Sequence, residues 1–213
     1  FYEKGAHEWR LCGYLTQREI AALSNYSLEE AQAAVEYCQN VGQQVVTPED
    51  EQFPPLLHQI HAKPCALYVL GKLPDWEAVP AVAIVGTRDA TENGKHIAFE
   101  FGYQLAKRGA VVVSGGALGT DGSAHRGALQ AGGRTLCVLG CGIGYGYLME
   151  KASLRDLIAK SGALISEFPV NTPPSRITFP VRNRLISGLC QGTLVVEAAA
   201  KSGSLITAQM ALE

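Results

Sequence analysis

Residues 81–121 decide the fold, and they read AVAIVGTRDATENGKHIAFEFGYQLAKRGAVVVSGGALGTD. The stretch begins with a continuous apolar run, 81–85, and carries a second one at 111–113. Apolar residues at helical spacing fill 97–106 between them, and Gly109 follows as a stop signal. Strands without polar alternation are typical of a sheet that is covered on both faces. The stretch therefore predicts a strand, a crossover helix and a second strand parallel to the first.

The same alternation continues toward the C-terminus. Further strands are predicted at 135–139, 163–165 and 193–196, and further helices at 154–159, at 182–189 and from Thr120 or Asp121, as the cap, to Gly132 and Gly133. Five buried strands separated by helices indicate right-handed crossovers and a doubly wound parallel sheet, an α/β fold of the Rossmann-like type. Such sheets bind ligands at the carboxyl ends of their strands.

The N-terminal part of the chain has a different character. Thr16 and Ser27 each precede a helical pattern, and Ser27 forms a capping box with Glu30. Residues 1–80 hold 5 Lys and Arg against 11 Asp and Glu, whereas residues 81–213 hold 13 against 9, so any polyanion contact is expected in the second part. We therefore expect a small helical module at 1–44, a connector at 45–80 and the Rossmann-like domain at 81–213.

Composition places the chain among globular proteins. It has 213 residues, 47% of them hydrophobic and 18% charged. No apolar window is long enough to span a membrane and no leader pattern is present, so a soluble cytoplasmic protein is expected. The scattered cysteines form no CxxC pair, which indicates reduced, buried thiols and no metal site. Because the chain opens with Phe1 and stops at Glu213 inside a helical pattern, we expect it to be part of a longer protein.

Glycine-rich segments follow the first three predicted strands. The first exit carries Gly86, Thr87 and Arg88, the second Ser114, Gly115 and Gly116, and the third Gly140-Cys141-Gly142. Glycines at one edge leave backbone N–H groups and helix N-termini open to phosphate. The alternative is that they only make tight turns. No G-x-x-x-x-G-K-[ST] motif occurs and no G-x-G-x-x-G follows the first strand, so no Walker-type NTPase and no nicotinamide or flavin cofactor is expected.

The last two exits carry arginines and further hydroxyl groups. Arg182 and Arg184 lie close to Arg176, and Phe179 and Asn183 stand among them. Arginine suits phosphate and phenylalanine offers a face for base stacking, so the cluster favours a nucleic-acid backbone with exposed bases. The alternative is a turn in which Phe179 fills the core and the arginines pair with Glu167 or Glu197.

The fifth exit ends in a helix start. Ser202, Gly203 and Ser204 begin the last predicted helix, a terminus suited to phosphate. Glu197, the one acid at a strand end, keeps an enzyme possible.

These motifs resemble the bacterial DNA-processing family DprA, also called Smf. The resemblance rests on the first three exits, on Phe179-Pro180-Val181-Arg182-Asn183-Arg184-Leu185-Ile186-Ser187-Gly188-Leu189, on Val195-Val196-Glu197-Ala198 and on Ser202-Gly203-Ser204-Leu205-Ile206-Thr207-Ala208. It covers residues 81–213, and the region before them is similar to the family's sterile-alpha-motif-like module. The resemblance implies a non-enzymatic cytosolic mediator that binds and protects incoming single-stranded DNA during natural transformation, loads the recombinase RecA and works as a homodimer through its Rossmann-like domain.

The resemblance also implies which residues contact DNA. By position they are Arg88, the loop 114–116, Arg176, Phe179, Arg182 and Asn183. Arg88 would hold a phosphate, Arg176 would add charge along the backbone, and Phe179 would pack on a base or sugar. The run 143–150 departs from the family pattern, which leaves the shape of that side of the pocket open.

Two other functions stay open at this point. One is an enzyme like the lysine-decarboxylase-like phosphoribohydrolases, although their Pro-Gly-Gly-x-Gly-Thr-x-x-Glu motif is missing here. The other is a sensor of a small nucleotide. His96 and His125 follow glycine-rich exits but have no nucleophile beside them in the sequence, so solvated or capping roles are expected for both.

Overall fold

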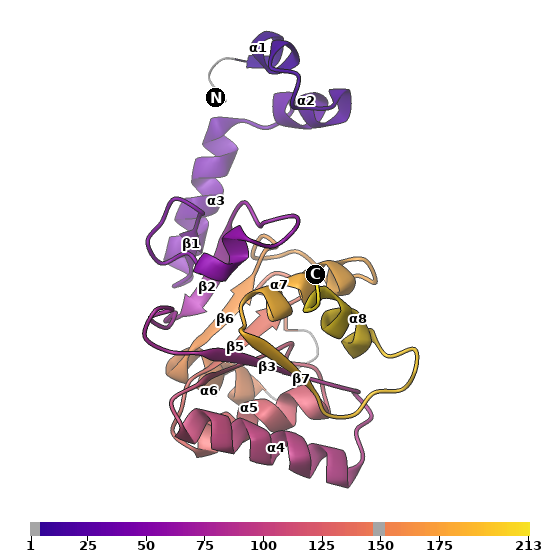
Figure 1. The fold of residues 1–213 in the computed structure, drawn as a ribbon. Coiled ribbons are helices and arrows are strands. Elements are labelled where there is room, and N and C mark those ends of the chain that lie inside the picture. The colour runs from indigo at the N-terminus through magenta and orange to yellow at the C-terminus, as the bar shows by residue number, and fades with distance from the viewer. Residues whose placement is uncertain (1–4, 147–151) are drawn as a thin grey trace. The chain divides into compact units, whose positions relative to one another are not determined.

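A computed structural model describes residues 5–146 and 152–213, and the chain divides into two compact units between Val41 and Gly42 (Figure 1). The first unit is helical and the second contains a seven-stranded sheet. The helical unit ends at Val41, three residues before the end expected for the module, and residues 42–80, which include the expected connector, belong to the unit with the sheet.

Three helices form the N-terminal unit: α1 (Gly5–Leu11), α2 (Gln17–Ser24) and α3 (Leu28–Asn40). Thr16 caps α2, since its hydroxyl accepts from the Glu19 backbone N–H and the Glu19 carboxylate accepts from the Thr16 N–H in return. Ser27 and Glu30 make the same reciprocal pair at α3. Two predicted helices are thus confirmed, α1 is an addition, and the likeness to a sterile-alpha motif stays a prediction.

The sheet has the strand order β1-β2-β6-β5-β4-β3-β7. The five predicted strands are β3 (Ala81–Val85), β4 (Val111–Ser114), β5 (Thr135–Leu139), β6 (Ala163–Ser166) and β7 (Gly192–Val195), and they pair with one another in parallel. The expected doubly wound, Rossmann-like sheet is therefore confirmed. Two further strands extend the sheet beyond β6 in antiparallel orientation: β2 (Leu67–Gly71) pairs with β6, and β1 (Gln44–Val46) pairs with β2.

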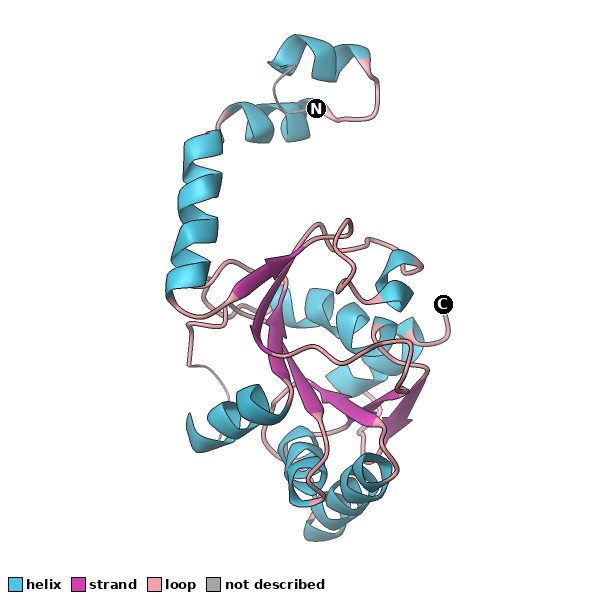
Figure 2. Ribbon diagram, turned by 90° about the vertical axis from the view of Figure 1, so that its left-hand side faces the viewer, coloured by secondary structure: helices cyan, strands magenta, loops and turns pink. Residues whose placement is uncertain are grey.

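Helices cover both faces of this sheet, as Figures 1 and 2 show. Alternate residues of one strand enter different cores: Val85 packs with Leu185 of α7 (Thr178–Gly188), whereas Ile84 packs with Ala98 of α4 (Glu92–Lys107) and Ala124 of α5 (Thr120–Gln130). The remaining helices are α6 (Ala152–Ser161), α8 (Gly203–Met210) and the short 3-10 helix η2 (Pro55–His58). This two-sided burial is the reason that the parallel strands read as continuous apolar runs.

Some element boundaries differ from those expected. Gly119, at φ 74°, is the N-cap of α5, so Thr120 and Asp121 lie inside its first turn and do not cap it. Helix α7 starts at Thr178, which places Arg182 in the helix body, and α8 ends at Met210, before the end of the chain. The segment 45–80, expected to be a connector, contributes strands to the sheet because its apolar residues pair with β6.

The six cysteines are free thiols, and Cys137 and Cys141 are buried. Cys65 is exposed, against the expectation of buried thiols, because it lies in the loop before β2. Among residues 5–146 and 152–213 no group of His, Cys, Asp and Glu side chains has the arrangement of a metal site. Within the same ranges, no helix has the length and apolar character needed to span a bilayer.

Candidate nucleic-acid interface

A cavity lies at the switch point of the sheet. From β3 the chain builds outward to β6 and then returns to place β7 on the other side of β3, so the loops after β3 and β7 diverge at the carboxyl edge. Such a point is where open α/β sheets bind ligands. The cavity holds about 330 Å³, and most of the predicted site residues line it: Gly86, Thr87, Arg88, Phe179, Arg182, Asn183, Ser202, Gly203 and Ser204.

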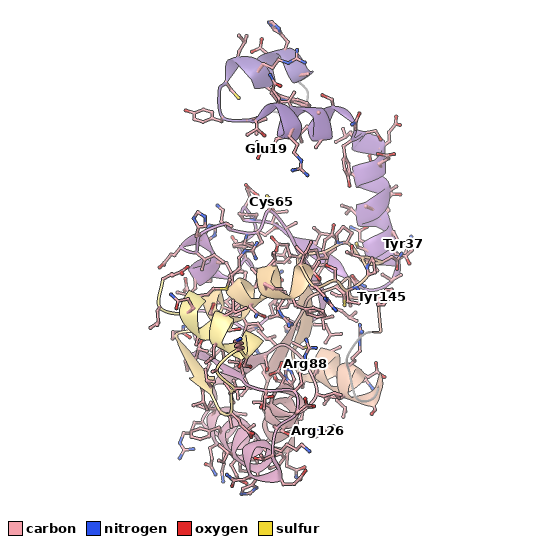
Figure 3. The ribbon with its side chains drawn as sticks, turned by 90° about the vertical axis from the view of Figure 1, so that its right-hand side faces the viewer. Glu19, Tyr37, Cys65, Arg88, Arg126 and Tyr145 are labelled. Carbon is pink, nitrogen blue, oxygen red and sulfur yellow. The ribbon has the colours of Figure 1, made fainter. Side chains whose placement is uncertain are left out.

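Arg88 and Phe179 form the mouth of this cavity. Arg88 is exposed, and its guanidinium carbon lies 5.4 Å from the centroid of the Phe179 ring, which is a cation–π distance. The half-buried ring is fixed from below, because a Cβ added to Gly140 would come within 2.7 Å of its Cδ1 atom. Figure 3 shows Arg88 near the middle of the sheet unit. An accessible cation therefore stands over an anchored aromatic ring.

Arg182 has a different environment from Arg88. It is 6% exposed, and its guanidinium donates to the backbone carbonyls of Gly115, at 2.9 Å, and of Val138. The Nε atom donates to the Asn183 side chain at 3.2 Å. Burial lowers the pKa of this guanidinium, and the charge of Asp121 opposes that shift. Arg182 thus forms the floor of the cavity and supports Phe179, whose ring centroid lies 5.9 Å from its Cζ atom.

Asp121 balances this buried charge across Gly115. A Cβ on Gly115 would lie 2.9 Å from both the Arg182 guanidinium and the Asp121 carboxylate, so a larger residue there would displace one of the two side chains. The carboxylate accepts from the Ala117 N–H at 3.2 Å. Burial raises the pKa of Asp121, while the positive charge of Arg182 lowers it. The sequence analysis considered Asp121 only as a possible helix cap; its place directly after a glycine-rich strand exit was the signal that could have marked it for the site.

Of the loop after β4, Ala117 lines the cavity, whereas the predicted residues Ser114, Gly115 and Gly116 do not. Ser114, Gly115 and Gly116 are all buried, and the Ser114 hydroxyl donates to the Ile84 carbonyl at 2.6 Å. Their contact with a ligand stays a prediction. What they do provide is a fixed wall that joins β3, β4 and Arg182.

The start of α8 also lines the cavity. Ser202 caps the helix, since its hydroxyl accepts from the Ser204 N–H at 3.4 Å, and the two hydroxyl oxygens lie 2.7 Å apart. Asn183 donates from its amide to the Gly203 carbonyl at 3.2 Å, which ties α7 to α8. The cavity is thus lined by the hydroxyl groups of Ser202 and Ser204 as well as by Arg88.

Two predicted arginines lie outside the cavity. Arg176 is exposed in the loop before α7 and does not line it. Arg184 forms an ion pair with Glu167 at 2.5 Å, as the alternative interpretation of the cluster expected for an arginine. Arg182 is buried and Arg184 is paired with Glu167 because residues two apart on a helix, here α7, face different directions.

Glu197, the acidic residue that left an enzymatic function possible, makes structural hydrogen bonds. Its carboxylate accepts from the Thr91 N–H at 3.1 Å and from the Thr91 hydroxyl at 3.0 Å. These contacts hold the N-terminus of α4, which Thr91 caps. The acids that do line the cavity are Asp89, which sequence reasoning missed although it follows Arg88 directly, and the buried Asp121.

His125 belongs to the core, so the expected solvated or capping role was wrong. Its side chain is fully buried, and Nδ1 lies 2.7 Å from the Thr135 hydroxyl. Burial, with the nearby charge of Arg126, lowers its pKa to about 3, so the ring is neutral. His96 is exposed. In the unusual run 143–150, residues 147–150 lie outside the described part of the chain.

Comparisons with known proteins agree on one family. The sequence model of DNA recombination-mediator protein A matches residues 44–213. A Synechocystis protein named Smf is 43% identical over 173 residues, which are 80% of this chain and 44% of that protein. The Bacillus subtilis DNA processing protein DprA is 40% identical over 76% of this chain and 55% of its own length. The chain thus spans about half the length of the curated relatives it matches.

Solved structures show the same relationship. The X-ray structure of DprA from Streptococcus pneumoniae superposes with a TM-score of 0.76 and 31% identity, covering 99% of this chain and 77% of that one. DNA processing protein A from Helicobacter pylori, whose structure concerns its binding of single-stranded DNA, gives a TM-score of 0.71 and 33% identity over 79% of this chain and 76% of that one. The chain belongs to the DNA recombination-mediator protein A family, also known as DprA or Smf.

Proposed function

We propose that the cavity at the switch point binds single-stranded DNA and that the protein acts in the cytoplasm as a recombination mediator. One observation carries this proposal: the exposed Arg88 guanidinium lies over the Phe179 ring at the mouth of the cavity, 5.4 Å from its centroid. A guanidinium binds phosphate, and an aromatic ring stacks on an unpaired base whatever the identity of that base. The H. pylori relative that binds single-stranded DNA supports the assignment.

The arrangement favours unpaired strands over duplex. The Phe179 ring lies half-buried between Arg88, Arg182 and Gly140. A base can therefore stack on this ring only when the face of the base is not already stacked on another base. Bases in a duplex are stacked on their neighbours and do not offer that face. The duplex can use only the phosphate contact with Arg88. We expect weaker binding of a duplex than of oligo-dT of the same length.

A salt series measures the phosphate contact. Fluorescence anisotropy with labelled oligo-dT gives the slope of log K against log salt, and each phosphate contact with a single strand contributes about 0.7 to its magnitude. Arg88→Ala should lower the affinity and reduce the slope by about 0.7. Arg108→Ala, which removes another exposed arginine at the C-terminal end of α4, should leave both unchanged. Equal affinity and slope for Arg88→Ala and the unchanged protein would overturn the proposal.

Mediation is the further part of the proposal. The bound strand would be protected and then passed to RecA, as in natural transformation, by a homodimer that forms through the Rossmann-like unit. A strand-exchange assay with RecA and single-stranded DNA coated by a single-strand-binding protein tests the transfer: addition of the protein should shorten the lag, and Arg88→Ala should not. Nuclease protection of the strand and sedimentation of the protein test protection and dimerisation.

The alternatives predict different outcomes. A phosphoribohydrolase would release free ribose 5-phosphate from AMP, and a nucleotide sensor would lose bound oligo-dT to a competing mononucleotide. Because Glu197 is engaged with Thr91 and not directed to the cavity, we propose binding without catalysis. Neither ribose 5-phosphate release nor displacement by AMP at a concentration near that of the oligonucleotide is expected.

A further inference from the structure

An exposed tyrosine stands at the same edge of the sheet as the cavity. Tyr145 follows β5 and is 44% exposed, and β5 is two strands from β3, whose exit carries Arg88. Strands β3, β4 and β5 pair in parallel, so their carboxyl ends lie along one edge of the sheet. Figure 3 labels both residues in the sheet unit.

The backbone of Tyr145 is held from one side by Arg155 of α6. One guanidinium nitrogen of Arg155 donates to the Tyr145 carbonyl at 2.8 Å, and another donates to the carbonyl of Ile143. The Tyr145 N–H closes a tight turn by donating to the Gly142 carbonyl at 3.0 Å. Both backbone polar groups of Tyr145 are therefore satisfied.

The turn is also joined to the loop after β6. The Gly142 N–H donates to the Thr172 carbonyl and the Gly144 N–H to the Val170 carbonyl, each at 2.9 Å. A Cβ on Gly142 would come within 2.2 Å of the Val170 carbonyl oxygen, so the two loops are in close contact. An aromatic ring on such a fixed turn loses little further backbone entropy when a flat partner binds it.

The Tyr145 turn is continuous with the Phe179 platform. Gly140, on which the Phe179 ring rests, is the first residue after β5 and precedes Tyr145 by one short turn. Strands in a sheet are about 4.8 Å apart, so the exits of β3 and β5 are separated by roughly 10 Å. Stacked nucleotides rise about 3.4 Å each, so about three of them cover that distance.

We propose that Tyr145 is a second base-stacking platform, which extends the binding surface from the Arg88–Phe179 mouth toward α6 along the carboxyl edge. This inference rests on the proposed single-strand binding and adds the direction and minimum length of the strand. A strand of two nucleotides occupies Arg88 and Phe179 only, whereas a longer strand reaches Tyr145. The contact is made with the base and carries no charge, so it is independent of sequence and of salt.

The test compares Tyr145→Ala and Tyr145→Phe on oligonucleotides of two lengths. We expect Tyr145→Ala to weaken binding of dT12 about fivefold or more, to leave binding of dT2 unchanged and to keep the salt slope of the unchanged protein. Tyr145→Phe should retain full affinity because the ring remains. Phe101→Ala, which removes an aromatic ring of similar exposure, 47%, in the middle of α4, is the matched control and should bind as the unchanged protein does. On a 12-mer that lacks bases, Tyr145→Ala should have no effect.

The outcomes separate this inference from the function on which it rests. If the unchanged protein binds dT12 and Arg88→Ala weakens that binding, but Tyr145→Ala does not, the second platform is refuted and the proposed function stands. An equal loss with dT2 and dT12, or a changed salt slope, would also refute it, since the loss would then arise at the mouth. If the unchanged protein binds no oligo-dT, both proposals fail together.

Discussion

Replacement of Arg182 by methionine should unfold the sheet unit more readily without changing the phosphate contact. The guanidinium is 6% exposed and donates to the carbonyls of Gly115 and Val138. Hydrogen bonds from a charged group contribute about 1.5–3 kcal/mol each, so the loss of two predicts destabilisation by about 3 kcal/mol or more. The change also leaves the buried carboxylate of Asp121 without its positive neighbour, which adds to the cost.

Urea denaturation of Arg182→Met and Arg88→Met tests the difference between the two arginines. Arg88 is exposed, so its replacement should change the free energy of unfolding by less than about 0.5 kcal/mol. In the salt series the order reverses: Arg88→Met reduces the slope by about 0.7 and Arg182→Met keeps it. Asp121→Asn combined with Arg182→Met should recover part of the lost stability, because both charges are then removed.

A free energy of unfolding for Arg182→Met within about 1 kcal/mol of that of the unchanged protein would contradict a structural role for Arg182, since the loss of charged hydrogen bonds to buried carbonyls costs more than that. A reduced salt slope for this variant would instead show that Arg182 reaches DNA directly. Should Arg182→Met not fold, Arg182→Lys, which keeps the charge but loses the fork of donors, should give a smaller loss with the same salt slope.

Three further predictions concern other residues. The pKa of His125 is about 3 in the folded protein and ordinarily 6.5, so between these pH values unfolding takes up a proton. The free energy of unfolding therefore falls as the pH drops below 6.5. From pH 6.5 to pH 5, urea denaturation should show the unchanged protein losing about 1.5 kcal/mol more than His125→Gln. Gly119→Ala should destabilise the protein by about 1–3 kcal/mol in the same assay, because residue 119 has φ 74° and the added Cβ would lie 2.3 Å from the Arg88 carbonyl oxygen. A free energy of unfolding equal to that of the unchanged protein would contradict this. Asp89→Asn should raise the affinity for oligo-dT in anisotropy titrations, because it removes a negative charge from the rim of the cavity; unchanged affinity at low salt would place Asp89 away from the strand.

The predicted order of strands and helices was correct because it depends on local patterns. The runs 81–85 and 111–113 are apolar at every position, which requires helices on both faces and hence a parallel sheet. For the segment 45–80 the sequence predicted only a connector, because β1 and β2 are short and gain their place in the sheet by pairing, β2 with β6 and β1 with β2. A strand at the edge of a sheet is specified by its partner more than by its own residues.

The same distinction holds for the site. Strand patterns alone were enough to predict that the glycine-rich exits, Arg88 and Phe179 gather at one edge, because parallel strands bring their carboxyl ends together. The burial of Arg182 under Phe179, the pairing of Arg184 with Glu167 and the exposure of Arg88 depend on tertiary packing. These arginines have the same chemistry, and what separates them is burial and the partners within reach, which depend on how α7 packs against the sheet.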